Sequence, residues 1–168
     1  MKPAGTPTGA APPDAERELQ RFVEKFEPRH RALIAAVRAA LRERLPAAHE
    51  LVYDNYNFLV VGYSPTERPS DSILSLTAGA NGVGLSFPYL GATLPDPHKL
   101  LLGSGKTNRF IRIESVETLA RPEVGALIDA AVARAKTPLP AQGAGRLIIR
   151  SVSATQRPRR KQLAPTAR

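Results

Sequence analysis

The sequence predicts one α+β domain, in which helices pack on an antiparallel sheet of about five or six strands. Three observations predict this fold class. Apolar residues recur with a helical period near the N-terminus, the period changes to two through the middle of the chain, and one more helical segment and one more strand segment follow. A chain of 168 residues is long enough to bury one hydrophobic core.

Two helices open the predicted domain, and a third follows the strands. The first is predicted to start near an Asp14 N-cap and the second at Pro28, a residue suited to a first helical turn. Their apolar faces repeat at helical spacing: Leu19, Phe22, Val23 and Phe26, then Leu33, Ile34, Val37, Leu41 and Leu45. The third helix is predicted to begin at Pro122 and to bury Val124, Leu127, Ile128, Ala131 and Ala135.

The strands are predicted from apolar segments of period two that turn residues separate. They are LVYDNY, NFLVVGY, SILSLTA, GVGLSFPY and RFIRI, and RLIIRSV after the last helix. Asn81-Gly82 predicts a two-residue hairpin, because a type I′ turn needs positive φ at both central residues. The polar segment from Ser64 to Asp71 is predicted to be an exposed turn.

Composition changes mark both ends of the domain. Residues 1–13 are mostly Pro, Gly, Ala and Thr, and the chain ends in RPRRKQLAPTAR, whose prolines disfavour helix and strand alike. We therefore expect a disordered tail over residues 1–13, an α+β domain over residues 14–152, and a basic, flexible tail over residues 153–168.

The positive charge is concentrated near the C-terminus. The formal net charge is +9, and seven basic residues but no acidic one lie between Arg146 and Arg168. Such a tail can hold polyanions, including nucleic acid, by counterion release without reading sequence, and it can also be a plain soluble chain end. The basic residues concerned are Arg157, Arg159, Arg160 and Lys161. The tail carries no aromatic residue on which a base could stack, so specific nucleic-acid binding is not favoured.

Several classes of chemistry are disfavoured by composition and spacing. The chain has no cysteine, which excludes disulfides, thiolate nucleophiles and Cys-based metal sites. No apolar run approaches the ~18 residues of a membrane span, and no signal-peptide core is present, so we expect a cytoplasmic protein that is not a membrane protein. No Ser/His/acid order, carboxylate pair or metal-ligand spacing indicates an enzyme, a cofactor or a bound metal.

The GSGKT segment before the fifth strand has the residue types of an anion-binding loop. It is not a P-loop, because Leu100 stands where that motif needs glycine and because a strand, not a helix, follows. Gly103 and Gly105 can let backbone N–H groups form a small anion nest, with Lys106 and Arg109 supplying charge. The alternative is a glycine-permitted turn with solvated cations.

The block Tyr53-Asp54-Asn55-Tyr56-Asn57 is the other candidate binding segment. Polar groups beside aromatic rings are typical of small-ligand pockets. Strand alternation places Tyr53 and Asn55 on one face and Tyr56 on the other, so only part of the block can line one cavity. Turn chemistry explains its Asp and Asn residues equally well.

Three stretches carry a family resemblance over residues 15–160. They are the pattern from Leu45-Pro46 through Glu50 and Tyr53, the segment LPDPHKLLLGSGK with the following RFIRI, and the ending SVSATQRPRR. The chain resembles the YdhG-like family of uncharacterised bacterial domains. The resemblance implies a frataxin-like fold and, because some relatives are described as iron chaperones, it raises an iron-handling hypothesis. The family's Tyr-Gly-Met-Pro is replaced here by Tyr53-Asp54-Asn55-Tyr56.

The working hypothesis is a small binding or interaction module for an anionic small molecule or an acidic partner. Lys106, Arg109 and Arg112 would contact the anion, and Tyr53, Asn55 and Tyr56 would line an adjacent hollow. One alternative is frataxin-like iron handling by carboxylates of the first helix, where interleaved arginines instead favour a solvated face. The other alternative is nonspecific nucleic-acid binding by the C-terminal tail.

Overall fold

The computed structural model describes residues 13–161 of the chain. In that part the helices are α1 (Pro13–Glu24), α2 (Pro28–Arg44) and α3 (Pro122–Ala133), with short 3-10 turns η1 (Pro69–Asp71), η2 (Gly91–Thr93) and η3 (Val116–Ala120). The strands are β1 (His49–Asp54), β2 (Leu59–Ser64), β3 (Leu74–Gly79), β4 (Gly82–Phe87), β5 (Arg109–Ile113) and β6 (Leu147–Val152). Residues 1–12 of the predicted N-terminal tail and residues 162–168 of the C-terminal tail lie outside the described residues.

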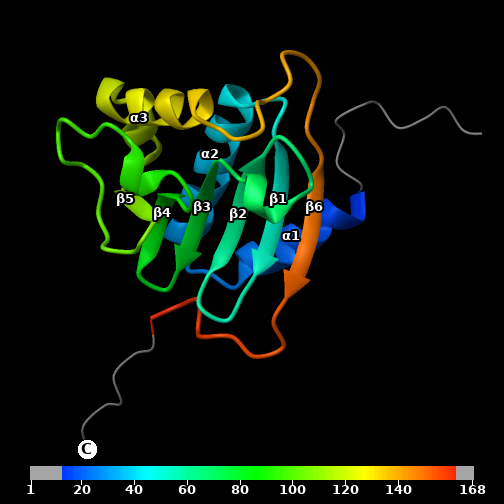
Figure 1. Cartoon of the computed structure of the whole chain (residues 1–168). Helices are drawn as coiled ribbons and strands as arrows, with labels where there is room; N and C mark the ends of the chain where they lie inside the picture. The colour runs from blue at the N-terminus through cyan, green and yellow to red at the C-terminus, as the bar shows by residue number, and fades with distance from the viewer. Residues whose placement is uncertain (1–12, 162–168) are drawn as a thin grey trace, which may run out of the picture.

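The predicted α+β fold is confirmed, but the sheet is mixed and not wholly antiparallel as predicted. The six strands form one open sheet in the order β5-β4-β3-β2-β1-β6, as Figure 1 shows. Neighbours from β1 to β5 pair antiparallel, whereas β6 pairs parallel with β1. β5 and β6 therefore point the same way, so the chain has to cross over the sheet between them. α3 lies in this crossover.

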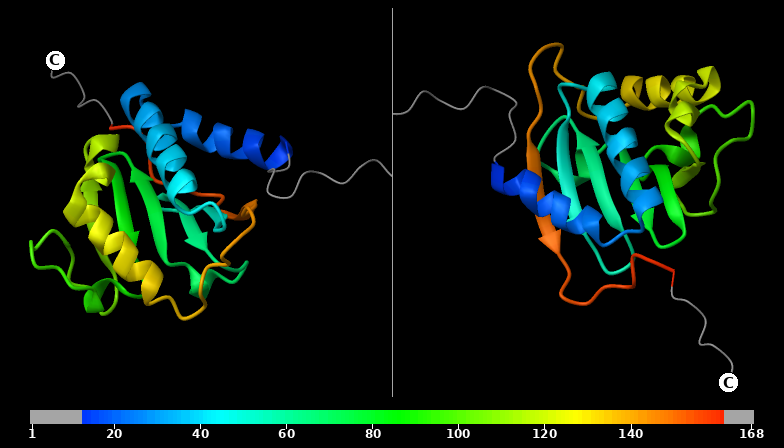
Figure 2. Two further views of the ribbon diagram at one scale, coloured as in Figure 1. Left: turned by 90° about the horizontal axis from the view of Figure 1, so that it is seen from above. Right: turned by 180° about the vertical axis from the view of Figure 1, so that it is seen from behind.

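The helices cover one face of the sheet. In Figure 2, α1 and α2 lie across the side turned away from the viewer of Figure 1. The core contains the alternate strand residues that point to this side, among them Leu59, Val61 and Tyr63 of β2. Val124 and Ile128 of α3 belong to the same core. The apolar side chains that recur every second residue on the strands thus pack against those that recur every 3.6 residues on the helices, and together they form one apolar layer.

The opposite face of the sheet carries small and polar side chains. On β2, β3 and β4 the residues that alternate with the core positions include Gly62, Ser75, Thr77, Gly84 and Ser86, and Val60 is the one larger apolar residue among them in these described strands. No α-helix covers this face in the described structure, but the η1 segment packs on β2 and loops from both ends of the sheet reach over parts of it (Figure 1). No described helix is long and apolar enough to span a bilayer.

A buried ionic network joins α1 and α2 to the sheet. Glu50 of β1 is 4% exposed, and its carboxylate accepts hydrogen bonds from Arg38 of α2 and from the Tyr63 hydroxyl of β2. The same Arg38 guanidinium donates two hydrogen bonds to Glu16 of α1. A buried carboxylate is tolerated when its charge is paired and its oxygens accept hydrogen bonds, and Glu50 meets both conditions.

The predicted hairpin joins β3 and β4, with a different turn. Gly79 pairs with Gly82, so the two loop residues are Ala80 and Asn81 rather than Asn81 and Gly82. Among hairpin residues 79–82 only Gly82 has positive φ, at 135°, which excludes a type I′ turn centred on Asn81-Gly82. Asn81 and its glycine nevertheless mark the place where the chain reverses.

The chain does not leave the domain directly after β6. Residues 153–161, which we call the C-terminal strap, run below the ends of β1 and β2 in the view of Figure 1. The Ser153 backbone N–H donates to the Asp54 carbonyl and the Arg157 N–H donates to the Tyr56 carbonyl. This part of the chain was expected to be a flexible tail. The hydrogen bonds instead make it part of the folded domain.

Candidate functional site

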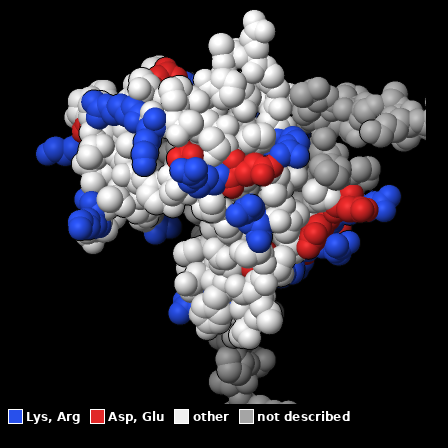
Figure 3. Space-filling view, turned by 45° about the vertical axis from the view of Figure 1, so that its right-hand side comes forward, with Lys and Arg blue, Asp and Glu red and all other residues white. Residues whose placement is uncertain are grey.

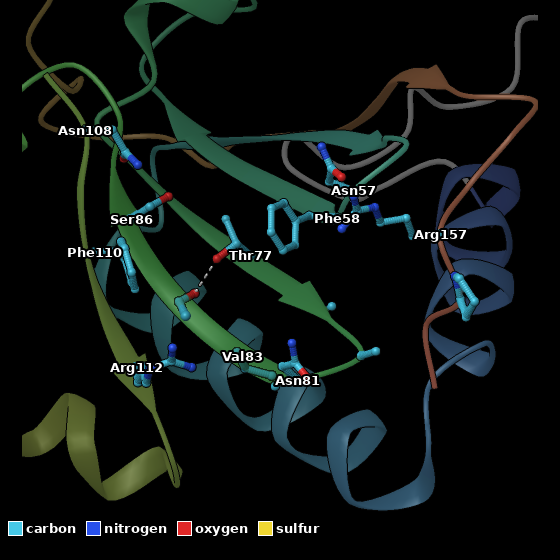
Figure 4. Close-up of a pocket in the computed structure, with 15 residues that line it drawn as sticks. Asn57, Phe58, Thr77, Asn81, Val83, Ser86, Asn108, Phe110, Arg112 and Arg157 are labelled. Carbon is cyan, nitrogen blue, oxygen red and sulfur yellow. Dashed lines mark hydrogen bonds between the residues drawn. The ribbon is translucent and has the colours of Figure 1, made fainter. Parts of the chain in front are cut away.

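A hollow of 510 Å³ lies on the open face of the sheet, over β3, β4 and β5 (Figure 4). We call it the sheet-face hollow. Its principal lining residues come from five parts of the fold, the β1–β2 loop, β3, β4, β5 and the C-terminal strap: Phe58, Thr77, Gly84, Phe110, Arg112 and Arg157. Its volume is within the range of small-molecule sites, roughly 300 to 1,000 Å³.

Glycines of β3 and β4 form the floor of the sheet-face hollow, and their lack of side chains makes the hollow deeper. Gly79, Gly82 and Gly84 line it without side chains, and Thr77 donates from its hydroxyl to the Gly84 carbonyl at 3.3 Å. A Cβ added at Gly84 would lie 3.0 Å from the Thr77 hydroxyl oxygen and 3.3 Å from the carbonyl oxygen of Ile111. A side chain at Gly84 would therefore be in tight contact with these two atoms, and glycine leaves the space above the strand backbone open.

Two phenylalanine rings flank this floor. Phe58, the residue before β2, is 51% exposed and its ring lies against Gly79 of β3, while Phe110 is on β5. β3 and β5 are two strand spacings apart, which is about 10 Å. Figure 4 shows both rings at the rim with Thr77 between them. Aromatic side chains in such a position offer surfaces on which a planar apolar ring can stack.

The charge lining the sheet-face hollow is entirely positive in the described structure. Arg112 and Arg157 are its charged lining residues, and neither forms a salt bridge with a described residue. The Arg157 guanidinium lies 5.7 Å from the centre of the Tyr56 ring. Side-chain amides from Asn57, Asn81 and Asn108 provide both donors and acceptors. This arrangement favours an anion that also has hydrogen-bonding edges.

The structure separates the cations predicted to hold an anion together. Arg112 lines the sheet-face hollow, but Lys106 and Arg109 do not. Arg109 donates to the backbone carbonyls of Gly105 and Asn108 and so closes its own loop. Gly103 has φ 107° and lies against the Phe110 ring, so this glycine supports the wall of the hollow from behind.

The tyrosine block also divides between two places. Tyr53 is on β1, outside the lining of the sheet-face hollow, and its hydroxyl is buried without a hydrogen-bond partner among the described residues. Burial raises the pKa of Tyr53, and the neighbouring Arg150 opposes that shift. Asn55 and Tyr56 offer backbone carbonyls to Arg159 of the C-terminal strap. Their visible role is therefore to hold the strap.

The four basic residues of the predicted polyanion tail have different surroundings. Arg159 is 4% exposed and pairs with Asp54, Arg157 lines the sheet-face hollow, and Arg160 donates to the Lys25 carbonyl. Lys161 is exposed at the end of the described chain. Because Arg159 is buried and paired, it is not free to bind a polyanion.

Asp54 is the anchor for this segment. Its carboxylate is fully buried and accepts from Lys25 at 2.6 Å and from Arg159 at 2.8 Å. Burial by itself would raise the pKa of Asp54, but hydrogen bonds from Lys25, Arg159 and Gln156 outweigh it and hold the pKa below the ordinary 3.8. The carboxylate is therefore ionised at neutral pH and forms ion pairs with both Lys25 and Arg159.

The carboxylates of α1 do not gather into a cluster. Hydrogen bonds from Arg38 hold the pKa of Glu16 below its ordinary 4.5. On the side that comes forward in Figure 3, acidic and basic groups lie next to one another. No group of three or more His, Asp or Glu side chains is placed to hold a metal ion within residues 13–161. The iron-handling hypothesis gains no support from this part of the chain.

Sequence reasoning missed both phenylalanines of the site. Phe58 was placed in an apolar strand segment, where exposure cannot be distinguished from burial. A signal was present in β4, where Gly82, Gly84 and Ser86 are small at every second position. Such a row predicts a sheet face with little side-chain cover, and aromatic residues beside it become candidate walls.

Comparisons of the chain with protein-family models, with curated proteins and with solved structures find no match. The resemblance to the YdhG-like family therefore stays a prediction, and the function is argued from the site alone.

Proposed function

We propose that this protein binds a small planar anion, a molecule with an aromatic ring and a carboxylate or phosphate group, in the sheet-face hollow. One observation carries the proposal: two phenylalanine rings line one 510 Å³ space with two arginines that have no ion-pair partner among residues 13–161, and the described lining contains no acid. The proposal keeps the anionic ligand predicted from sequence and moves its site from the GSGKT loop to the open sheet face.

The lining residues have separate roles in this proposal. The ring of the ligand lies over Gly84 between Phe58 and Phe110, where stacking supports any flat apolar group. Arg112 faces the same space from β5 and pairs with the anionic group. Charge-assisted hydrogen bonds from arginine are about twice as strong as neutral ones, so charge is expected to dominate selectivity. The amides of Asn81 and Asn108 then orient the ring.

Matched ligand pairs test the proposal directly. We would measure binding of 2-naphthoate against neutral 2-naphthamide, and of adenosine monophosphate against adenosine, by isothermal titration calorimetry. Loss of a hydrogen bond to a charged group costs about 1.5 to 3 kcal/mol, so at least one anion should bind roughly tenfold or more tighter than its neutral partner.

One arginine variant and one lysine variant test whether the anion binds in the sheet-face hollow. Arg112→Gln should remove most of the preference for the anion, whereas Lys106→Gln, an exposed cation outside the hollow, should leave it unchanged. The proposal is contradicted if neither anion binds better than its neutral partner, or if both variants lose the preference equally.

A further inference from the structure

One wall of the sheet-face hollow comes from the C-terminal strap. Arg157 and Pro158 line the hollow, and both belong to a segment without helix or strand. One of the two lining arginines is therefore carried by a part of the chain that could leave the sheet without breaking a strand pair. What holds the strap in place consequently matters for the site.

A buried ion pair holds it. The Arg159 side chain is 2% exposed, and its Nη2 atom lies 2.8 Å from Oδ1 of the fully buried Asp54. The same guanidinium donates to the carbonyls of Asn55 and Tyr56. A guanidinium removed from water is costly unless it is paired and hydrogen-bonded, so these partners decide whether the strap stays docked. We call this pair the Asp54–Arg159 latch.

The strap backbone transmits the effect of the latch to the hollow. Arg157 and Arg159 are separated only by Pro158, whose ring restricts its own φ and the conformation of the residue before it. The Arg157 N–H also donates to the Tyr56 carbonyl at 2.8 Å. With Arg159 anchored, Arg157 has little freedom to move away from the rim of the hollow.

We infer that Arg159 is a positioning residue for the sheet-face hollow: by pairing with Asp54 it holds Arg157 where a planar anion binds. This inference rests on the proposed function. Arg159 itself lines no part of the hollow, so its influence on binding passes through the strap. By linkage, a bound anion stabilises the docked strap to the same extent that docking strengthens binding.

Arg160 provides a matched control within the strap. It is exposed, and it donates only to the backbone carbonyls of Lys25 and Glu24. Arg160→Gln removes the same charge one residue away from Arg159 and leaves the latch intact. A general effect of net charge on anion binding would appear in both variants, whereas positioning would appear only at Arg159.

The experiment is a double-mutant cycle in the full chain, with 2-naphthoate as the probe and calorimetry as the readout. Arg157→Gln and Arg159→Gln should each weaken binding about tenfold, the cost of one charged contact. The double variant should bind no more weakly than the worse single variant, because both changes remove the same contact. Arg160→Gln should bind like the wild type. Equal binding by wild type and Arg159→Gln, or additive losses in the cycle, overturns the inference.

A ligand-free measurement separates the latch from the proposed function. Hydrogen exchange at residues 153–161 and trypsin cleavage after Arg160, a site that the wild type and the variant both keep, should be slow in the wild type and fast in Arg159→Gln. 2-Naphthoate should slow them further in the wild type. If the wild type does not bind the probe, the proposed function fails and the positioning role fails with it, while exchange still reports on the latch. If it binds and the cycle is additive, only the inference fails.

A second variant guards against loss of folding. Removing Arg159 alone leaves Asp54 buried with Lys25 as its remaining ionic partner, which can destabilise the domain. Asp54→Asn/Arg159→Met removes both charges of the latch, and such replacements of buried pairs are often tolerated. This variant should stay folded by circular dichroism, bind 2-naphthoate about as weakly as Arg157→Gln, and release the strap. Wild-type binding by this folded variant also overturns the inference.

Discussion

Tyr63→Phe tests the ionic network that joins the helices to the sheet. Tyr63 is fully buried, and its hydroxyl donates to Oε2 of Glu50 at 2.9 Å. Burial and the Glu50 carboxylate raise the pKa of Tyr63 well above 10.0, so the hydroxyl keeps the proton that it donates. The substitution removes this one donor and leaves the ring in the core.

The expected loss of unfolding free energy depends on the hydrogen bonds that Glu50 still accepts in the variant. A hydrogen bond to a charged group contributes about 1.5 to 3 kcal/mol. Arg38 still donates to both Glu50 oxygens at 2.9 Å, so the carboxylate is not left unpaired and the low end applies. We expect a loss of about 1.5 kcal/mol, or roughly 3 to 6 °C in Tm for a domain of this size.

Glu50→Gln sets the scale for comparison. It removes the charge that Arg38 and Tyr63 share, and breaking a buried pair costs about 3 to 5 kcal/mol. Arg38 keeps Glu16 as a partner, so we expect about 3 kcal/mol, again the low end. The Glu50 change should therefore cost about twice as much as the Tyr63 change.

Urea unfolding followed by far-ultraviolet circular dichroism measures both free energies, with an unchanged m-value as the check on two-state behaviour. Tyr89→Phe is the control, because that tyrosine is 48% exposed and its loss should stay within about 0.5 kcal/mol. The reasoning is refuted if Tyr63→Phe also stays within that limit, or if it costs as much as Glu50→Gln.

Three further predictions concern pH and packing. Because the pKa of Asp54 is lower folded than its ordinary 3.8, the stability that this carboxylate contributes is complete above that pH and is lost as the pH falls through the folded value. The difference in unfolding free energy between wild type and Asp54→Asn should therefore shrink below about pH 3.8, and a difference that stays constant from pH 5 to 2 would disprove the linkage. Gly91→Ala should cost about 2 to 3 kcal/mol in urea unfolding, since the new Cβ would lie 2.4 Å from a backbone nitrogen of β5. Gly105→Ala, whose nearest neighbour would be 3.6 Å away, is its control and should be nearly neutral. Gly79→Ala places a Cβ 3.0 Å from the exposed Phe58 ring, so it should keep stability within about 1 kcal/mol while weakening 2-naphthoate binding several-fold; unchanged affinity would argue against a Phe58 wall.

Most elements were predictable because their signals are local. The segment RFIRI coincides with β5, and Pro28 and Pro122 are the first residues of α2 and α3. Asp14 lies inside the first turn of α1 rather than before it, since the helix begins at Pro13. Side-chain alternation and proline geometry depend on only a few neighbouring residues, so a single sequence is enough to recognise them.

The position of β6 was not predictable in the same way. RLIIRSV was recognised as a strand, but its pairing with β1 joins segments about a hundred residues apart. Side-chain alternation predicts which residues of a strand face the core, but it does not predict which strand pairs with which. The connection from β5 to β6, which contains α3, crosses the sheet to its other edge, and there β6 pairs parallel with β1.

Single residues of the site likewise differ in how far the sequence alone predicted their place. Lys106, Arg109 and Arg112 are close in sequence, and charge alone suggested a common anion site. Strand alternation then turned Arg112 to the open face, while Arg109 bonded to its own loop. Phe58 was the opposite case, since an exposed ring and a core ring look alike in an apolar segment.

The α+β class, the alternation between a covered and a bare sheet face, and the absence of cysteine chemistry can be read from the residues alone. The chain had to fold before two phenylalanines, three glycines and two arginines from distant segments came to surround one space. Folding also buries Arg159, which reads as one of several tail cations, against Asp54. The physical reason is range: propensity and periodicity act along the chain, whereas burial and charge pairing depend on which segments meet after folding.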